Sequence, residues 1–134
     1  PFTSGDETCG DDNSDKRKVS PACHALSGRA HVAGKYTEDD DDKPGWWDGL
    51  VGYGKGIDLE KYFVVCVNLP GSPFGTTAPQ SIDPATGKPY GSRYPWPTIE
   101  DMVHSQKRVL DYLCIKRLQS ITGGSPGGIQ VLRW

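Results

Sequence analysis

One serine of the chain lies in a glycine-rich segment that is typical of a catalytic nucleophile. Residues 123–128 read Gly-Gly-Ser-Pro-Gly-Gly, with Ser125 inside them and a helix-like segment, 129–134, after them. Glycines have no Cβ and let the backbone turn sharply between a strand and a helix, which leaves a serine hydroxyl exposed for attack. We therefore predict a nucleophile turn at 123–128, although turns rich in Gly and Ser without a catalytic role are common.

Pro126 occupies the position directly after this candidate nucleophile. In serine enzymes with such a turn, the backbone N–H at that position stabilises the oxyanion intermediate, and proline has no N–H. Removing one such donor typically lowers the rate by about 10²–10³-fold. Proline also restricts the residue before it, so we expect it to disfavour the strained backbone that Ser125 needs. Proline is nevertheless favourable as the first residue of a helix.

The clearest strand of the sequence is the apolar run within residues 61–68. Its β-branched and aromatic residues are continuous, which is typical of a strand buried on both faces of a parallel sheet that helices cover. A long loop rich in Gly and Pro, 69–97, follows it. Open α/β sheets bind ligands at the carboxyl ends of their strands, so we expect this loop to have a functional role.

A helix over about 98–113 is predicted next, because Thr98 and Asp101 match a capping box. Apolar residues recur at helical spacing along it, with Gln106 as one polar interruption. The run 118–122 predicts a second strand, which leads into the serine turn. Strand, helix and strand in this order predict an α/β fold with a right-handed crossover.

The N-terminal part of the chain carries weaker signals. Residues 1–18 are polar and charged, so we expect a loop or a disordered arm before a core domain at 19–134. Pro21 cannot donate to a sheet ladder, which predicts that any strand in 19–25 is short, broken or at an edge. The acidic loop 36–45 lacks the ligand spacing of a calcium loop, which favours a solvated loop.

Composition excludes several classes of function. The 134 residues carry a net charge of -2, so we expect no nucleic-acid partner and no attraction to anionic membranes. No apolar run is long enough to span a bilayer. No cysteine pair has zinc-ligand spacing, which predicts no metal site and favours free buried thiols in a reducing compartment. The adjacent Trp46 and Trp47 are expected to pack on the sheet rather than to line a pocket.

Several motifs in the same order together resemble a known family. The segment 24–134 resembles the homoserine O-acetyltransferase family, which are acyltransferases with an α/β-hydrolase fold. The matching stretches are 24–28, 31–34, 45–50, 62–66, 68, 75–77, 82–91, 98–103 and 123–125. They extend over about four fifths of the chain, and agreement by chance at so many places is very improbable.

The resemblance implies a cytoplasmic serine acyltransferase of methionine biosynthesis. Such an enzyme moves an acetyl group from acetyl-CoA, which is a substrate and not a bound cofactor, to the hydroxyl of homoserine. Ser125 would be the nucleophile that becomes acylated. The oxyanion hole would be formed by the backbone of Leu26 and by position 126, where Pro126 offers no N–H. The resemblance leaves open whether the donor is acetyl or succinyl, and which alcohol accepts the group.

The sequence also departs from the family pattern. The family's catalytic Asp and His follow the serine in chain order, whereas nine residues follow Ser125 here. The three histidines, His24, His31 and His104, all precede the serine, and the resemblance gives none of them the role of base. We expect His24, which neighbours the oxyanion loop, to be structural. These departures predict a partial α/β-hydrolase fold that is incomplete at both ends.

Three functional hypotheses therefore remain from the sequence. The first is an acyltransferase present as a fragment or as one piece of a processed enzyme. The second is a serine esterase on the same fold. The third is a non-catalytic remnant or binding module, favoured by Pro126 and the missing Asp and His. A half-sheet has an unpaired edge, so we also expect a marginally stable chain that forms a homodimer or associates with a missing C-terminal half.

Overall fold

The computed structural model describes residues 3–11, 18–39 and 41–134. Its strands are β1 Asp6–Cys9, β2 Val19–Cys23, β3 Val51–Gly52, β4 Ile57–Asp58, β5 Phe63–Val67, β6 Ile82–Asp83, β7 Lys88–Pro89 and β8 Thr122–Gly123. Its helices are the 3₁₀ helix η1 Gly91–Arg93 and the α-helices α1 Ile99–Tyr112 and α2 Pro126–Arg133. None of the described helices is long and apolar enough to cross a membrane.

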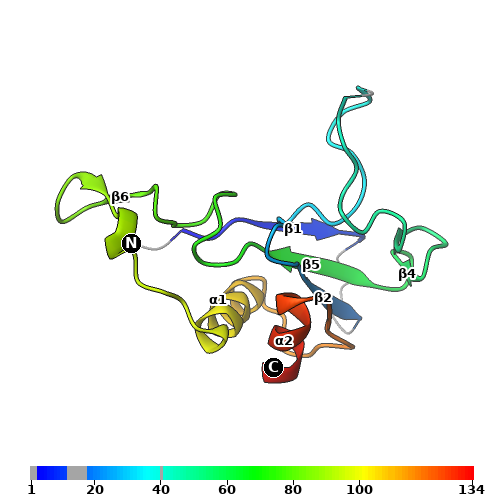
Figure 1. The fold of residues 1–134 in the computed structure, drawn as a ribbon. Coiled ribbons are helices and arrows are strands. Elements are labelled where there is room, and N and C mark those ends of the chain that lie inside the picture. The colour runs from blue at the N-terminus through cyan, green and yellow to red at the C-terminus, as the bar shows by residue number, and fades with distance from the viewer. Residues whose placement is uncertain (1–2, 12–17, 40) are drawn as a thin grey trace.

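A four-stranded sheet in the order β1-β5-β2-β8 organises the fold. Strand β2 runs parallel to both β5 and β8, and only β1 is antiparallel to its neighbour. Both α-helices lie on one face of this sheet (Figure 1). The β3–β4 and β6–β7 pairs are small and separate from it. This arrangement confirms the predicted α/β class with a mostly parallel sheet.

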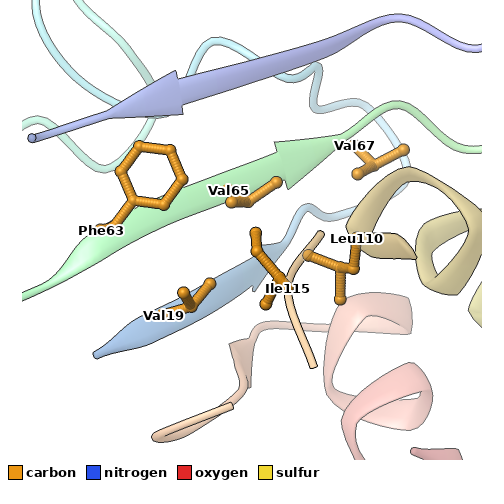
Figure 2. Close-up of a cluster of buried hydrophobic side chains, with 6 residues drawn as sticks. All are labelled: Val19, Phe63, Val65, Val67, Leu110 and Ile115. Atoms are coloured by element: carbon orange, nitrogen blue, oxygen red, sulfur yellow. The ribbon is translucent and has the colours of Figure 1, made fainter. Parts of the chain in front are cut away.

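Strand β5 supplies both halves of the hydrophobic core, as its continuous apolar run predicted. All five of its residues are buried. Successive side chains of a strand point to opposite faces, so Phe63, Val65 and Val67 face the helices. There they form one cluster with Val19 of β2, Leu110 of α1 and Ile115 (Figure 2). This cluster fixes α1 against the sheet.

The opposite face of the sheet is covered by an irregular segment rather than by a helix. Val64 and Cys66 of β5 pack there with Val32 and Val51. Trp46 and Trp47 pack against this second cluster, with ring centroids 4.6 Å apart, which confirms the predicted packing role. The segment between β2 and β3 extends on this side of the sheet in Figure 1. The helices predicted to flank the sheet therefore lie on one face only.

Strand β2 corrects the prediction that a strand around Pro21 is broken or at an edge. All five residues of β2 are buried, and the strand is central, between β5 and β8. The backbone N–H of Gln119, on the β8 side, donates to the carbonyl of Val19 at 2.8 Å. Backbone groups two residues apart in a strand point to the same side, so the nitrogen of Pro21 also faces β8. Pairing with β8 begins only at Ala22 opposite Thr122. The missing N–H therefore faces away from β5 and does not interrupt the pairing with it.

Strand β1 corrects the prediction that residues 1–18 form a loop or disordered arm. Residues 6–9 pair with β5, and Glu7 lies opposite Cys66. The His31 Nδ1 lies 2.9 Å from one Glu7 carboxylate oxygen, and Tyr36 donates to the other at 2.8 Å. Ladder bonds need only the backbone, so a charged strand can complete the edge of an apolar one. Residues 1, 2 and 12–17 of the predicted arm lie outside the described residues.

Two further segments differ in detail from their predictions. The loop 69–97 is not wholly irregular, because it contains the β6–β7 hairpin and η1. The strand expected at 118–122 has its ladder only at Thr122–Gly123. The acidic segment 36–45 has no helix or strand among its described residues, and residue 40 lies outside them. The four cysteines are free, with Cys23 and Cys66 buried as predicted.

The ends of α1 explain why this helix was predictable. Thr98 is its N-cap and forms the full capping box with Asp101. After the C-cap, Cys114 donates to Asp111 at 3.0 Å and Ile115 donates to Leu110 at 2.8 Å. This pair of bonds is a Schellman motif, which requires a left-handed residue in the position of Cys114. Cys114 has φ 58° in a place where glycine is usual.

We predict that Cys114→Gly stabilises the protein. The left-handed conformation costs an L-residue about 1 kcal/mol that glycine does not incur, so the free energy of unfolding should rise by about 0.5–1 kcal/mol. Chemical denaturation of the wild type and the variant measures this. Cys114→Ala is the matched control, because it removes the exposed thiol but keeps the strain. A control that stabilised as much as the glycine variant would contradict the explanation.

Candidate active site

The segment around Ser125 is a sharp turn between a strand and a helix. Strand β8 ends at Gly123, and α2 begins at Pro126 with Ser125 as its N-cap. The backbone of Ser125 has φ 56° and ψ -130°, which is rare for a residue with a side chain. Its side chain is exposed. A strained serine raised between a strand and a helix matches the geometry of a nucleophile turn.

Pro126 does not prevent this conformation, contrary to the expectation from the sequence. The proline ring disfavours mainly the α region for the preceding residue, and a ψ of -130° lies outside that region. Helix α2 begins at Pro126, ahead of the helix-like segment expected at 129–134, and the preference of proline for the first helical position favours this start. The amides of Gly127 and Gly128 donate to Gly124 and Ser125, both at 2.9 Å, and close the turn.

The first turn of α2 packs directly on the end of β2. A Cβ on Gly127 would lie 2.1 Å from the carbonyl oxygen of Cys23 and 3.0 Å from that of His24. A Cβ on Gly123 would lie 2.6 Å from the carbonyl carbon of Gly127. Both contacts are with backbone atoms, which cannot move aside easily. Glycine at these two positions is therefore required by helix–strand packing as well as by the turn.

The predicted oxyanion residue, Leu26, lies in the turn that follows β2. Gly28 donates to the carbonyl of Ala25 at 2.8 Å, which closes a turn with Leu26 inside it. The Leu26 side chain is 84% exposed. Since β2 and β8 are parallel neighbours, the turns containing Leu26 and Ser125 leave the same edge of the sheet. Whether the Leu26 amide binds an oxyanion stays a prediction.

His24 fixes the shape of this turn. Its ring is fully buried, with Nδ1 at 2.7 Å from the carbonyl oxygen of Ala25. A Cβ on Gly28 would lie 2.9 Å from the Cβ of His24, so the turn closes tightly over the side chain. Burial lowers the pKa of His24, which favours the neutral ring. These contacts support the structural role expected for His24. His31 binds Glu7, and His104 is exposed on α1.

Sequence reasoning missed a buried polar pair beside the candidate nucleophile. Gln106 of α1 and Gln130 of α2 are both buried, with the Nε2 of Gln106 at 2.5 Å from the Oε1 of Gln130. Gln106 was visible only as a polar interruption of an apolar face, and nothing marked Gln130. A polar residue at a core position of a predicted helix is the signal that could have found them.

In the part of the chain that the structure describes, neither a metal site nor a reactive thiol is apparent near the turn. The described residues contain no group of three or more His, Cys, Asp or Glu that could hold a metal ion. Burial raises the pKa of Cys23 to about 11, which keeps this thiol protonated. A cavity of about 880 Å³ lies between the 69–97 segment and α1, and Ser125 and Leu26 are not among the residues that line it. The functional role expected for the 69–97 loop stays a prediction.

The fold and the turn together define a class of protein. A mostly parallel sheet, a strand–turn–helix with a strained serine and a second turn at the same sheet edge are features of the α/β-hydrolase fold. A structure of homoserine O-acetyltransferase from Bacillus anthracis matches with TM-score 0.92 and 38% identity, covering 100% of this chain and 37% of that one. Esterase E22 matches with TM-score 0.91 and 41% identity, covering 98% of this chain and 37% of that one.

Comparison with curated sequences narrows the class. No protein-family model matches the chain. Homoserine O-acetyltransferase of Deferribacter desulfuricans is 52% identical over 134 residues, which are 100% of this chain and 35% of that protein. Homoserine O-succinyltransferase of Burkholderia multivorans is 51% identical over 128 residues, 96% of this chain and 33% of that protein. The chain belongs to the homoserine O-acetyltransferase family and spans about a third of the length of these relatives.

We predict that Gly127→Ala disrupts the site, whereas Gly128→Ala does not. The Cβ at 127 would overlap backbone atoms of β2, so α2 must shift, at a cost of about 1–3 kcal/mol in unfolding free energy. At 128 the nearest atom is the carbonyl oxygen of Gly123 at 3.4 Å, and alanine should stabilise the helix by about 0.5–1 kcal/mol. Denaturation of both variants measures the difference. Equal stabilities would contradict the packing argument.

Proposed function

We propose that the protein carrying this chain is an acyltransferase that moves an acetyl group from acetyl-CoA to the hydroxyl of homoserine. One observation carries the proposal: the strained, exposed Ser125 lies in a chain that is 52% identical over its whole length to a homoserine O-acetyltransferase. Because the chain covers 35% of that relative, the activity is proposed for the whole protein. The four free cysteines support a reducing location, and we propose the cytoplasm.

The proposed reaction has two steps at one serine. The hydroxyl oxygen of Ser125 attacks the thioester carbonyl, the C–S bond breaks, and the thiol of CoA leaves with the proton taken from the serine. The hydroxyl of homoserine then attacks the acyl-serine, and its proton returns to Ser125. The general base and its carboxylate would follow the serine in chain order, so no residue of this chain is assigned to those roles.

The oxyanion hole of this proposal depends mainly on Leu26. Its backbone N–H lies in a turn at the same sheet edge as Ser125, and that turn is held by His24 and Gly28. Pro126 has no N–H to offer. Among the described residues, no backbone carbonyl accepts a hydrogen bond from Leu26, which is consistent with this role.

A serine esterase is the second candidate, favoured by the similarity to esterase E22. That structure is 41% identical and has the same fold over 98% of this chain. In this case water, not homoserine, would attack the acyl-serine. The same residues would act in the first step, with an ester in place of the thioester, so the two candidates differ in the acyl donor and in the acceptor. The acyl donor, acetyl-CoA or succinyl-CoA, is also left open, because the homoserine O-succinyltransferase of Burkholderia multivorans is 51% identical to this chain.

The test measures free thiol during incubation with acetyl-CoA, with and without homoserine. We expect thiol release that requires homoserine, and an acetyl adduct in the intact mass that Ser125→Ala abolishes. Release that needs no homoserine would favour the esterase. No release and no adduct in the full-length protein would refute the proposal and leave the non-catalytic alternative or an esterase that does not accept the thioester. Succinyl-CoA in place of acetyl-CoA tests the donor.

We also predict that Pro126→Ala increases the rate of acylation. Alanine keeps a helix-compatible first residue and supplies the N–H that proline lacks. One oxyanion donor typically contributes about 10²–10³-fold in rate, and part of this gain is expected in kcat. Single-turnover kinetics with acetyl-CoA measures it. A rate unchanged or lowered in a folded variant would show that position 126 does not contribute to the oxyanion hole.

A further inference from the structure

A continuous chain of hydrogen bonds through two buried side chains joins α1 to the residue that follows Ser125. The Nε2 of Gln106 donates to Gln130, and the Nε2 of Gln130 donates at 3.2 Å to the carbonyl oxygen of Pro126. Gln106 is 4% exposed and Gln130 is 0% exposed. The two helices that carry them lie next to each other on one face of the sheet (Figure 1). The chain of bonds therefore ends at the first residue of α2.

The direction of each bond is set by groups that can only donate. The indole Nε1 of Trp134 donates to the Oε1 of Gln106 at 2.8 Å, and indole nitrogen is never an acceptor. The thiol of Cys23 approaches the same oxygen at 3.7 Å. The amide oxygen of Gln106 is thus fixed on this side, which turns its nitrogen to Gln130. Gln130 must then present its oxygen to Gln106 and its nitrogen to Pro126.

A buried amide pair of this kind destabilises the fold unless its polar groups are hydrogen-bonded. Burying an amide without partners costs free energy that apolar side chains would not cost at the same positions. The pair connects three elements that surround the nucleophile turn, because Cys23 ends β2, Gln106 lies on α1 and Gln130 lies on α2. A rare backbone conformation such as that of Ser125 persists only where its surroundings over-determine it.

We propose that Gln106 and Gln130 are positioning residues that hold the first turn of α2, and with it Ser125, in the strained conformation. The proposal rests on the proposed function only for its kinetic consequence. The side chain of Gln130 donates to the Pro126 carbonyl and so holds the first residue of α2 in addition to the helix backbone. Gln106 in turn fixes the Gln130 side chain relative to β2, through Cys23, and relative to the C-terminal end of α2, through Trp134. Neither side chain touches the reacting atoms.

Gln130→Met and Gln130→Glu test the proposal in the full-length protein. Methionine removes every polar contact at similar length. Glutamate keeps the length and can still accept from Gln106, but in its ionised form it cannot donate to Pro126. Hydrogen–deuterium exchange is followed at the amides of residues 127–129, which bond to Gly124 and Ser125. We expect exchange there to be about tenfold faster in Gln130→Met, and in Gln130→Glu at a pH where the buried carboxyl is ionised.

Two control variants separate positioning from general stability. Leu110→Ala removes a core side chain of α1 and should destabilise the fold without selective exchange at 127–129. Glu100→Gln breaks the exposed ion pair with Arg133, which joins the same two helices away from the turn. Both controls should keep the wild-type pattern of exchange relative to the rest of the chain. A control that reproduced the Gln130 pattern would overturn the proposal.

The kinetic measurement is the second readout. For the Gln130 variants we expect kcat to fall by about 10–100-fold with the KM for acetyl-CoA nearly unchanged, because a misplaced nucleophile affects the transition state more than binding. Unchanged exchange at 127–129, or faster exchange with wild-type kcat, would overturn the positioning role. A wild-type protein that forms no acyl adduct would refute the proposed function, and the exchange data would still decide whether the pair holds Ser125.

Discussion

The site depends on one close contact, the approach of α2 to the end of β2. The Cα of Gly127 faces the carbonyl groups of Cys23 and His24 at a distance that leaves no room for a Cβ. A helix can come this near to a strand only where the helix residue is glycine. The contact places the start of α2 over the edge of the sheet where β2 and β8 both end. Ser125 and the turn around Leu26 are therefore brought to one edge.

The two faces of the sheet are packed differently, and each supports the contact between α2 and β2 in its own way. On one face α1 packs on an apolar cluster of β2 and β5, and the buried glutamine pair links it to α2. On the other face an irregular segment with Trp46 and Trp47 completes the core. The helix face thus determines where the nucleophile turn lies. The irregular face keeps β2 and β5 buried, which stabilises the strand from which the Leu26 turn begins.

Family membership and site geometry support the same kind of chemistry. The strained backbone of Ser125 matches the role that acyl transfer through a serine requires. Pro126 is compatible with that backbone but has no N–H to donate to an oxyanion. The proposed reaction therefore relies more on the Leu26 turn than a turn with two donors would. The buried glutamines add a constraint on Ser125 that acts from within the helix layer.

Local signals in the sequence determined several features by themselves. The capping box of Thr98 and Asp101 and the two-faced apolar run of β5 both involve residues near one another in the chain, and each was predicted correctly. The tertiary structure alone decided that a strand with Pro21 is central, that charged residues 6–9 form a strand, and that Gln106 meets Gln130. It also decided the backbone of Ser125. The physical reason is that ladder partners, buried amide pairs and strained turns are fixed by residues far away in the chain, which no local pattern records.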